Sequence, residues 1–201
     1  MTFRFPRRLA TEARKVSLLP PYARREDGPA QMPRVHYIAY GSNLHPVRLI
    51  ARVPSARAVD VVEMRGHRLA FDKRSTDGSA KCHVYTEEAE HHTVYGALYE
   101  FDARHKPRLD AAEGAGYRQR VAGVPMNGEG YRPYTYVARR SYIEPNLLPY
   151  HWYKSLVLAG ARFHGFPEDY VATIEAAPST HDPDRERVRR NERLLEDMEH
   201  R

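Results

Sequence analysis

The sequence predicts an α+β fold with a closed or nearly closed sheet. Stretches with the two-residue alternation of β-strands dominate the middle of the chain, and stretches with helical spacing of apolar residues follow toward its end. With 201 residues, of which 41% are hydrophobic, the chain suits one ordinary domain or a domain with tails. Strands and helices segregated in this way are typical of the α+β class.

The expected elements begin with a buried strand over residues 35–41. A helix is expected over 45–53, where Pro46 suits the first turn. Residues 58–71 alternate well enough for one long strand, or for two strands with a bend at Gly66.

A polar loop is expected over residues 72–80, with a strong turn at Asp77-Gly78. Two further strands are expected over 81–88 and 92–101. These strands complete the central part of the sheet.

Residues 102–114 have the pattern of a helix. Asp102 can cap its start, and Gly114 suits the left-handed conformation after its end. Pro107 fits poorly inside a helix, which favours a start nearer residue 106.

The last part of the chain is predicted to form a β-hairpin and then helices. The hairpin is predicted around residues 127–130. The elements expected here are strands over 117–126 and 132–139, and helices over 149–165, 167–177 and 182–200.

Charge is concentrated at the N-terminal end. The formal net charge is +6 and the isoelectric point about 9.5. The arginine-rich first 25 residues account for this excess, so it is weak evidence for a nucleic-acid partner. We predict a basic, proline-containing extension over 1–34, a folded domain over 35–178, and a charged C-terminal helix or tail over 179–201. A mitochondrial targeting segment is the alternative interpretation of the extension.

The composition also bears on location and cofactors. Cys82 is the single cysteine, which excludes an internal disulfide and a four-cysteine zinc site and fits a reducing cytoplasm. No stretch approaches the ~18 apolar residues that a membrane span needs. His91 and His92 lack a partner at ligand spacing, so we expect no metal.

Residues 40–44, Tyr-Gly-Ser-Asn-Leu, end the first expected strand just before the first helix. The N–H groups of Gly41 to Leu44 can form a nest there for a carboxylate or a developing oxyanion. Glycine also lets the backbone approach a ligand closely. An ordinary turn is the alternative.

Three motifs follow one another along the chain: YGSNL (40–44), LDAAEG (109–114) followed by Tyr117, and YKSLVLAGARFHGFPEDYVATI (153–174). In this order they resemble the γ-glutamylcyclotransferase family, and residues 71–81 also resemble its loop before the central strands. The resemblance covers about residues 35–176.

This resemblance implies a small mixed β-barrel flanked by helices. It implies conversion of a γ-glutamyl amide into 5-oxoproline and a free amine, without metal or cofactor. It also implies that the loop holds the substrate and that one glutamate is the acid/base. The corresponding residues are Tyr40, Gly41, Ser42, Asn43 and Leu44 for binding, and Glu113 for catalysis.

The chemistry explains why one carboxyl suffices. The α-amine of the glutamyl group attacks its own side-chain amide, so no Ser or Cys nucleophile is needed and the enzyme must fix a folded substrate. A base removes a proton from the ammonium, and the departing amine needs one back. Glu113 lies in the last turn of its expected helix, where the dipole and partial burial should raise its pKa. A solvated glutamate is the alternative.

Tyr117 and Tyr153 are further candidates for substrate binding, because family members have tyrosines near the glutamyl group. Core tyrosines are the alternative. Tyr150 stands where a serine is common, and with Trp152 it is expected to alter the leaving-group pocket.

The predicted function is therefore a γ-glutamyl cyclotransferase acting on a small-molecule substrate, with no nucleic-acid or membrane partner. A non-catalytic metabolite-binding or interaction module of the same fold is the alternative. Nucleic-acid binding through the basic extension is a third hypothesis. The leaving amine, the pathway (glutathione turnover or another), the oligomeric state and the role of the extension stay open.

Overall fold

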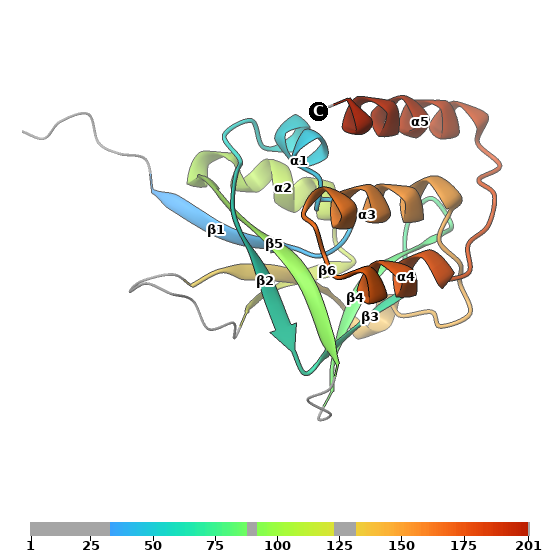
Figure 1. Ribbon diagram of the computed structural model, residues 1–201, viewed down its shortest axis with the longest axis horizontal. Helices are drawn as coiled ribbons and strands as arrows, with labels where there is room; N and C mark the ends of the chain where they lie inside the picture. Colours follow the sequence, from blue (N-terminus) through green and yellow to red (C-terminus); the bar gives the residue numbers. More distant parts are fainter. Residues whose placement is uncertain (1–32, 88–91, 123–131, 201) are drawn as a thin grey trace, which may run out of the picture. The chain divides into compact units, whose positions relative to one another are not determined.

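The computed structural model describes residues 33–87, 92–122 and 132–200 (Figure 1). Almost all of the predicted extension and the hairpin turn at 127–130 lie outside these ranges. The strands are β1 (Arg34–Ala39), β2 (Arg57–Arg65), β3 (His67–Arg74), β4 (Ala80–Thr86), β5 (Thr93–Asp102), β6 (Tyr117–Val121) and β7 (Tyr134–Ala138). The α-helices are α1 (Pro46–Arg52), α2 (Lys106–Glu113), α3 (His151–Phe163), α4 (Glu168–Ala176) and α5 (Arg185–Glu199), and two short 3-10 turns are Ala103–His105 and Arg140–Tyr142.

The main sheet is mixed and has the strand order β2-β5-β1-β7-β6. Strand β1 lies in its centre, antiparallel to β5 and parallel to β7. Strands β6 and β7 pair antiparallel, as predicted for the hairpin. The α+β class is therefore confirmed, and β1 delivers the chain from the middle of the sheet directly into the loop that follows it.

The strands are arranged differently from the small mixed barrel that the resemblance implied. Within the described residues, β3 and β4 form a separate two-stranded sheet, and no closed ring of hydrogen-bonded strands is present. The two sheets touch through β3 with β5 and through β4 with β7. At Cys82 in β4, tyrosine hydroxyls bond the backbone N–H and C=O where a neighbouring strand would otherwise pair. Side chains thus take the place of strand pairing at this edge.

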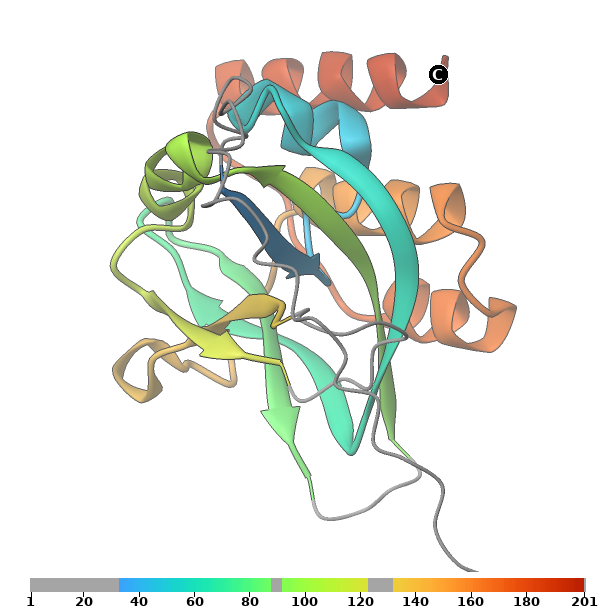
Figure 2. The ribbon, with the colours of Figure 1, turned by 90° about the vertical axis from the view of Figure 1, so that its left-hand side faces the viewer.

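Helices cover one part of the sheet (Figures 1 and 2). Helix α3 packs against both α4 and α5, and its residues Leu156, Val157 and Ala161 are fully buried. Tyr95 of β5 meets the rings of Phe166 and Tyr170 near α4. The described helices include none that is both long and apolar enough to cross a membrane.

Several expected boundaries shift in ways that matter for the site. Residues 58–71 resolve into two strands that bend at Gly66, where φ is +67°. The loop prediction for 72–80 was wrong at its beginning, because β3 continues to Arg74 and pairs with β4. Lys73 is consequently a buried strand residue, not a loop residue.

The helix predicted over 102–114 begins at Lys106, as the proline suggested, with Pro107 in its first turn. Asp102 does not cap it, because a 3-10 turn intervenes and the Asp102 side chain makes no capping hydrogen bond. Gly114 ends the helix at φ +73°, a conformation that favours glycine. This ending leaves Glu113 as the last helical residue.

Candidate active site

The loop after β1 approaches β4 closely. A Cβ added at Gly41 would lie 3.0 Å from Cβ and 3.3 Å from Sγ of Cys82, so glycine is needed for space and not for a positive φ. The N–H of Leu44 donates to the carbonyl of Gly41 at 2.9 Å, which closes the turn. The N–H groups of Gly41, Ser42 and Asn43 are then the candidates for binding an anion.

Glu113 reaches this loop from the end of α2. Asn43 Nδ2 donates to Glu113 Oε1 at 2.6 Å and lies 3.3 Å from the hydroxyl of Tyr37. Arg52 Nη1 donates to Asn43 Oδ1 at 2.6 Å and lies 3.9 Å from Glu113 Oε1. Asn43 therefore connects the carboxylate to a cation and fixes one of its two oxygens.

Burial is the main influence on Glu113, and it raises the pKa of the carboxyl above its usual value. Arg52, the Asn43 hydrogen bond, Arg48 and Lys73 act in the opposite direction without cancelling the effect. The sequence predicted a raised pKa from the helix dipole and partial burial; in the structure, burial is the largest cause. A carboxyl in this state is suited to proton transfer near neutral pH.

Tyrosine hydroxyls surround the carboxyl. Tyr117 donates to the Cys82 carbonyl at 2.6 Å, and the N–H of Cys82 donates to the hydroxyl of Tyr153 at 3.0 Å. Tyr40 donates to the carbonyl of Tyr136 at 2.5 Å. Burial raises the pKa of Tyr40, Tyr117 and Tyr153 well above the usual value, so all three are neutral phenols at physiological pH.

These groups line one small cavity, which brings together all the sequence-predicted site residues except Leu44. Its lining is Tyr37, Tyr40, Gly41, Ser42, Asn43, Cys82, Glu113, Tyr117, Tyr136 and Tyr153. Leu44 is fully buried, and its carbonyl accepts from Tyr99 at 2.5 Å and lies 2.8 Å from His164 Nε2. Leu44 thus anchors the loop to the core, and it does not line the cavity.

Cys82 also lines this cavity, but its side chain is a protonated thiol and not a thiolate. Burial raises its pKa to about 12, which disfavours the nucleophilic thiolate. In the part of the chain that the structure describes, no cluster of three His, Cys, Asp or Glu side chains is arranged to hold a metal ion. His91 lies outside that part.

A second cavity of about 90 Å³ adjoins the first and shares Ser42, Glu113, Tyr117 and Tyr153 with it. Sequence reasoning missed most of this lining. The residues it adds are Arg48, Arg52, Lys73, Ser75, Lys81, Ala112 and Trp152. One signal was available, because two arginines four residues apart on a helix lie on one face, and α1 directly follows the loop.

A larger hollow of about 940 Å³ lies elsewhere, among β2, β3, β4, β6 and β7. Glu113 and the 40–44 loop do not line it. Strands along it lead into residues 88–91 and 123–131, which lie outside the described ranges. We therefore place the candidate site in the two small cavities that share Glu113.

Residues 93–174 match the model of the AIG2-like family. A solved structure described as a γ-glutamyl cyclotransferase is 20% identical, with a TM-score of 0.69, over 82% of this chain and 99% of that one. An uncharacterized protein from Homo sapiens is 23% identical, with a TM-score of 0.68, over 81% and 98%. A Bacillus subtilis protein is 17% identical, with a TM-score of 0.57, over 73% and 56%. These likenesses show the fold.

The match to the AIG2-like model and the fold shared with a structure described as a γ-glutamyl cyclotransferase support the family predicted from the three motifs. The second and third motifs overlap the region matched by the AIG2-like model, and the first lies before it. None of the curated proteins compared with the chain is significantly similar to it in sequence.

Proposed function

We propose that the protein is a γ-glutamyl cyclotransferase in which Glu113 is the general acid/base. The observation that carries the proposal is the buried Glu113 carboxyl with its raised pKa, placed in one cavity with the Tyr40–Asn43 loop. Such a perturbed carboxyl in a cavity is a typical mark of a catalytic group.

The reaction needs one proton carrier. Glu113 accepts a proton from the substrate ammonium, and the freed amine nitrogen attacks the side-chain amide carbon to form the five-membered ring. The bond from that carbon to the leaving nitrogen then breaks as Glu113 returns the proton to this nitrogen. The ring nitrogen loses its second proton to Glu113 as the lactam forms, and Glu113 passes it to the freed amine, which leaves as an ammonium ion. Because Asn43 holds Oε1, Oε2 is the oxygen available for these transfers. The products are 5-oxoproline and the free amine.

In this proposal the loop and the tyrosines hold the substrate in the bent conformation that ring closure needs. As proposed, the N–H groups of Gly41, Ser42 and Asn43, which line the cavity, bind the substrate carboxylate or the oxyanion formed on attack. Neutral Tyr117 and Tyr153 lie in the lining shared by both cavities, where phenols can orient the substrate without adding charge. Holding the substrate bent is most of the catalytic task, because ring closure is unimolecular.

The same proposal implies which kind of substrate, which partners and which compartment belong to the enzyme. The substrate is a small γ-glutamyl amide, and neither nucleic acid nor membrane is part of the reaction. The buried free thiol of Cys82 is compatible with the reducing cytoplasm, where we place the enzyme.

The test is release of 5-oxoproline from a panel of γ-glutamyl amino acids and γ-glutamyl amines. We expect turnover by the wild type and a loss of about 10²–10⁴-fold in kcat/KM for Glu113→Gln. Glu175→Gln is the control, since Glu175 is an exposed residue of α4 that pairs with Arg162. Full activity of Glu113→Gln would show that another group moves the proton. No release from any substrate, with binding intact, would favour the non-catalytic binding module.

A further inference from the structure

The segment after α4 is tied to the start of α3, where Trp152 enters the lining of the second cavity. Thr180 donates to the Pro149 carbonyl and accepts from the His151 N–H, each at 2.9 Å. Helix α5 then packs against α3 and also contacts α1, which borders the same cavity (Figures 1 and 2). The match to the AIG2-like model ends at residue 174, so it assigns no role to this segment.

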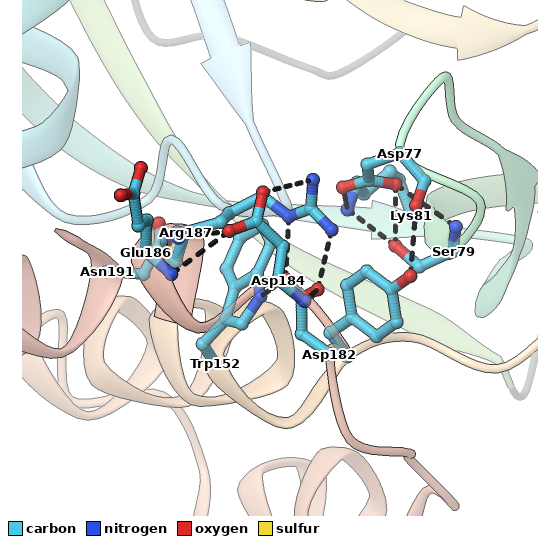
Figure 3. Close-up of polar contacts among 10 residues, drawn as sticks. Asp77, Ser79, Lys81, Trp152, Asp182, Asp184, Glu186, Arg187 and Asn191 are labelled. Atoms are coloured by element: carbon cyan, nitrogen blue, oxygen red, sulfur yellow. Dashed lines mark hydrogen bonds and ion pairs between the residues drawn. The ribbon is translucent and has the colours of Figure 1, made fainter. Parts of the chain in front are cut away.

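Asp182 is the polar centre of the segment, and its side chain is fully buried (Figure 3). Its Oδ2 accepts from Trp152 Nε1 at 2.7 Å and from Arg187 Nε at 2.6 Å. Its Oδ1 accepts from Arg187 Nη2 at 2.5 Å and from the Asp184 N–H at 2.9 Å. Both oxygens are thus engaged, and the two-pronged contact with Arg187 gives the carboxylate one orientation. The indole N–H of Trp152 therefore meets an acceptor of fixed direction.

The Trp152 ring also contacts groups of the candidate site. Lys81 Nζ lies 4.6 Å from the centre of this ring and 4.6 Å from that of the Tyr153 ring. Lys81, Trp152 and Tyr153 all line the second cavity together with Glu113, and Tyr153 lines the first cavity as well. Trp152 is therefore the connection between the Asp182 carboxylate and the side chains that surround Glu113.

Tyr150 adds a second connection, although it does not line the cavity. The Arg187 guanidinium lies 5.5 Å from the centre of the Tyr150 ring, and the Tyr150 hydroxyl donates to the Asp77 carbonyl at 2.9 Å. Asp77 Oδ2 in turn accepts from Lys81 Nζ at 2.7 Å (Figure 3). Of the two residues expected to alter the leaving-group pocket, Trp152 thus lines the second cavity, and Tyr150 supports the turn that holds Lys81.

Resting on the proposed function, we propose that Asp182, oriented by Arg187, is a positioning residue for the reaction that fixes the Trp152 indole as a wall of the second cavity. A buried ion pair often adds no more stability than apolar residues of similar volume, and its directional bonds favour one geometry. Ring closure depends on holding a bent substrate beside Glu113, so a displaced wall lowers the rate without changing the proton carrier. The C-terminal segment is in this way part of the active site.

The experiment is a double-mutant cycle on 5-oxoproline release, with the panel member that the wild type turns over fastest. Asp182→Leu replaces the acceptor oxygens by methyl groups, and Trp152→Phe removes the donor and keeps an aromatic ring. Each single variant should lose about tenfold in kcat/KM, and the double variant about tenfold as well, because both changes break one contact. The free energy of unfolding should still fall when Asp182→Leu is added to Trp152→Phe, because Asp182 also bonds Arg187 and Asp184.

Further variants keep the test decisive if Asp182→Leu does not fold. Arg187→Met keeps an apolar stem over Tyr150 and removes the guanidinium that orients Asp182, so it should lower kcat/KM about threefold or more. Arg187→Lys keeps the charge and should lose less than Arg187→Met. Val188→Ala is the matched control, because Val188 packs the same turn of α5 against the core through an apolar side chain. It should lower the stability and keep kcat/KM within about twofold of the wild type.

Trp152 is the only tryptophan of the chain, so its fluorescence reports the position of this wall without any substrate. Acrylamide should quench the folded Asp182→Leu and Arg187→Met proteins more strongly than the wild type, because their indole is no longer held. Quenching of Val188→Ala should match the wild type.

Three results would overturn the proposal. Quenching equal to that of the wild type in both Asp182→Leu and Arg187→Met would show that the carboxylate does not fix the indole. Wild-type kcat/KM in Asp182→Leu, or losses that multiply in the double variant, would show that Asp182 does not act through Trp152. An equal loss of kcat/KM in Val188→Ala would mean that activity only follows the stability of the segment. If the wild type turns over no member of the panel, the proposed function fails separately, and the quenching still decides whether Asp182 holds the wall.

Discussion

Asn43 donates a 2.6 Å hydrogen bond to Glu113, across 70 residues of sequence and between the loop after β1 and the end of α2. The same Asn43 accepts from Arg52 through its other amide atom. A single side chain thus sets the position of the carboxylate and connects it to α1. The loop is therefore bound to the candidate acid/base as well as to the substrate that we propose.

Replacing Asn43 by alanine should change the pH dependence of the reaction. The hydrogen bond from Asn43 lowers the pKa of Glu113, so Asn43→Ala should raise that pKa further. Because the base must be deprotonated to act, the acid limb of kcat/KM should move to higher pH, and kcat/KM at neutral pH should fall by about 10–100-fold. The pH profile of 5-oxoproline release measures both effects.

Asn191→Ala provides the control for that profile, because Asn191 lies on α5 and its amide donates to the carbonyl of Arg187 on the same helix. Its profile should match the wild type. An acid limb that stays in place or moves to lower pH in Asn43→Ala would contradict the role given to this hydrogen bond.

Glu113→Gln should leave the protein at least as stable at neutral pH. Since burial raises the folded-state pKa of Glu113 above its unfolded value, its favourable contribution is complete only below the unfolded pKa and is lost as pH rises through the folded pKa. The glutamine has no charge to bury. The Tm of Glu113→Gln relative to the wild type should therefore rise between pH 4 and pH 8, and a falling difference would refute the raised pKa.

Much of the site could be predicted because it lies in contiguous motifs. Tyr40 to Asn43, Glu113, Tyr117 and Tyr153 were all identified from three short stretches, and the structure places them around one cavity. Leu44 was included because it belongs to the motif. Its buried apolar side chain and the contacts of its carbonyl with Tyr99 and His164 anchor the loop to the core instead. No local sequence pattern reveals this role.

The second cavity could not be predicted, for a physical reason. Lys73 and Lys81 are brought to Arg48 by the pairing of β3 with β4 and by the contact of these strands with the loop. The sequence gives no indication that Lys73 is buried, because a lysine in a polar stretch is usually solvated. The extension of β3 to Arg74 depends on long-range pairing, which overrides the local turn signals.

Gly160→Ala should damage the site although Gly160 does not line it. A Cβ there would overlap Leu44 Cβ and lie 2.9 Å from the backbone nitrogen of His45, so α3 would be pushed away from the loop. Helix propensity alone predicts that this change stabilises by about 1 kcal/mol. The overlap should reverse the sign, with a loss of about 1–3 kcal/mol in the free energy of unfolding and a lower kcat/KM.

Ala159→Gly separates the two contributions, because it changes the neighbouring position of the same helix in the opposite direction without adding an atom. It should lose about 1 kcal/mol with kcat/KM near the wild-type value. Urea denaturation together with 5-oxoproline release measures both variants. A Gly160→Ala protein that is more stable and fully active would show that α3 does not set the position of the loop.

Asp182→Asn should loosen the C-terminal segment that supports Trp152. The Asp182 side chain is fully buried and accepts hydrogen bonds from Trp152 Nε1 at 2.7 Å and from Arg187 Nε at 2.6 Å (Figure 3). Burial acts to raise its pKa, but the hydrogen bonds from Arg187, the Asp184 N–H and Trp152 outweigh it and lower the pKa to about 2. Removing the charge should cost about 1–3 kcal/mol at pH 7.

The pH dependence of that loss is the sharper test. A carboxyl whose pKa is depressed in the folded state contributes stability above its unfolded pKa, near 3.8, and loses it as pH falls toward about 2. The difference in unfolding free energy between wild type and Asp182→Asn should therefore be constant from pH 7 to pH 5 and shrink as pH falls below 4. Asp197→Asn, an exposed position of α5, should show no difference throughout. Trp152 fluorescence during urea unfolding follows the segment directly, and a gap that is as large at pH 3 as at pH 7 would contradict the assigned role of the Asp182 charge.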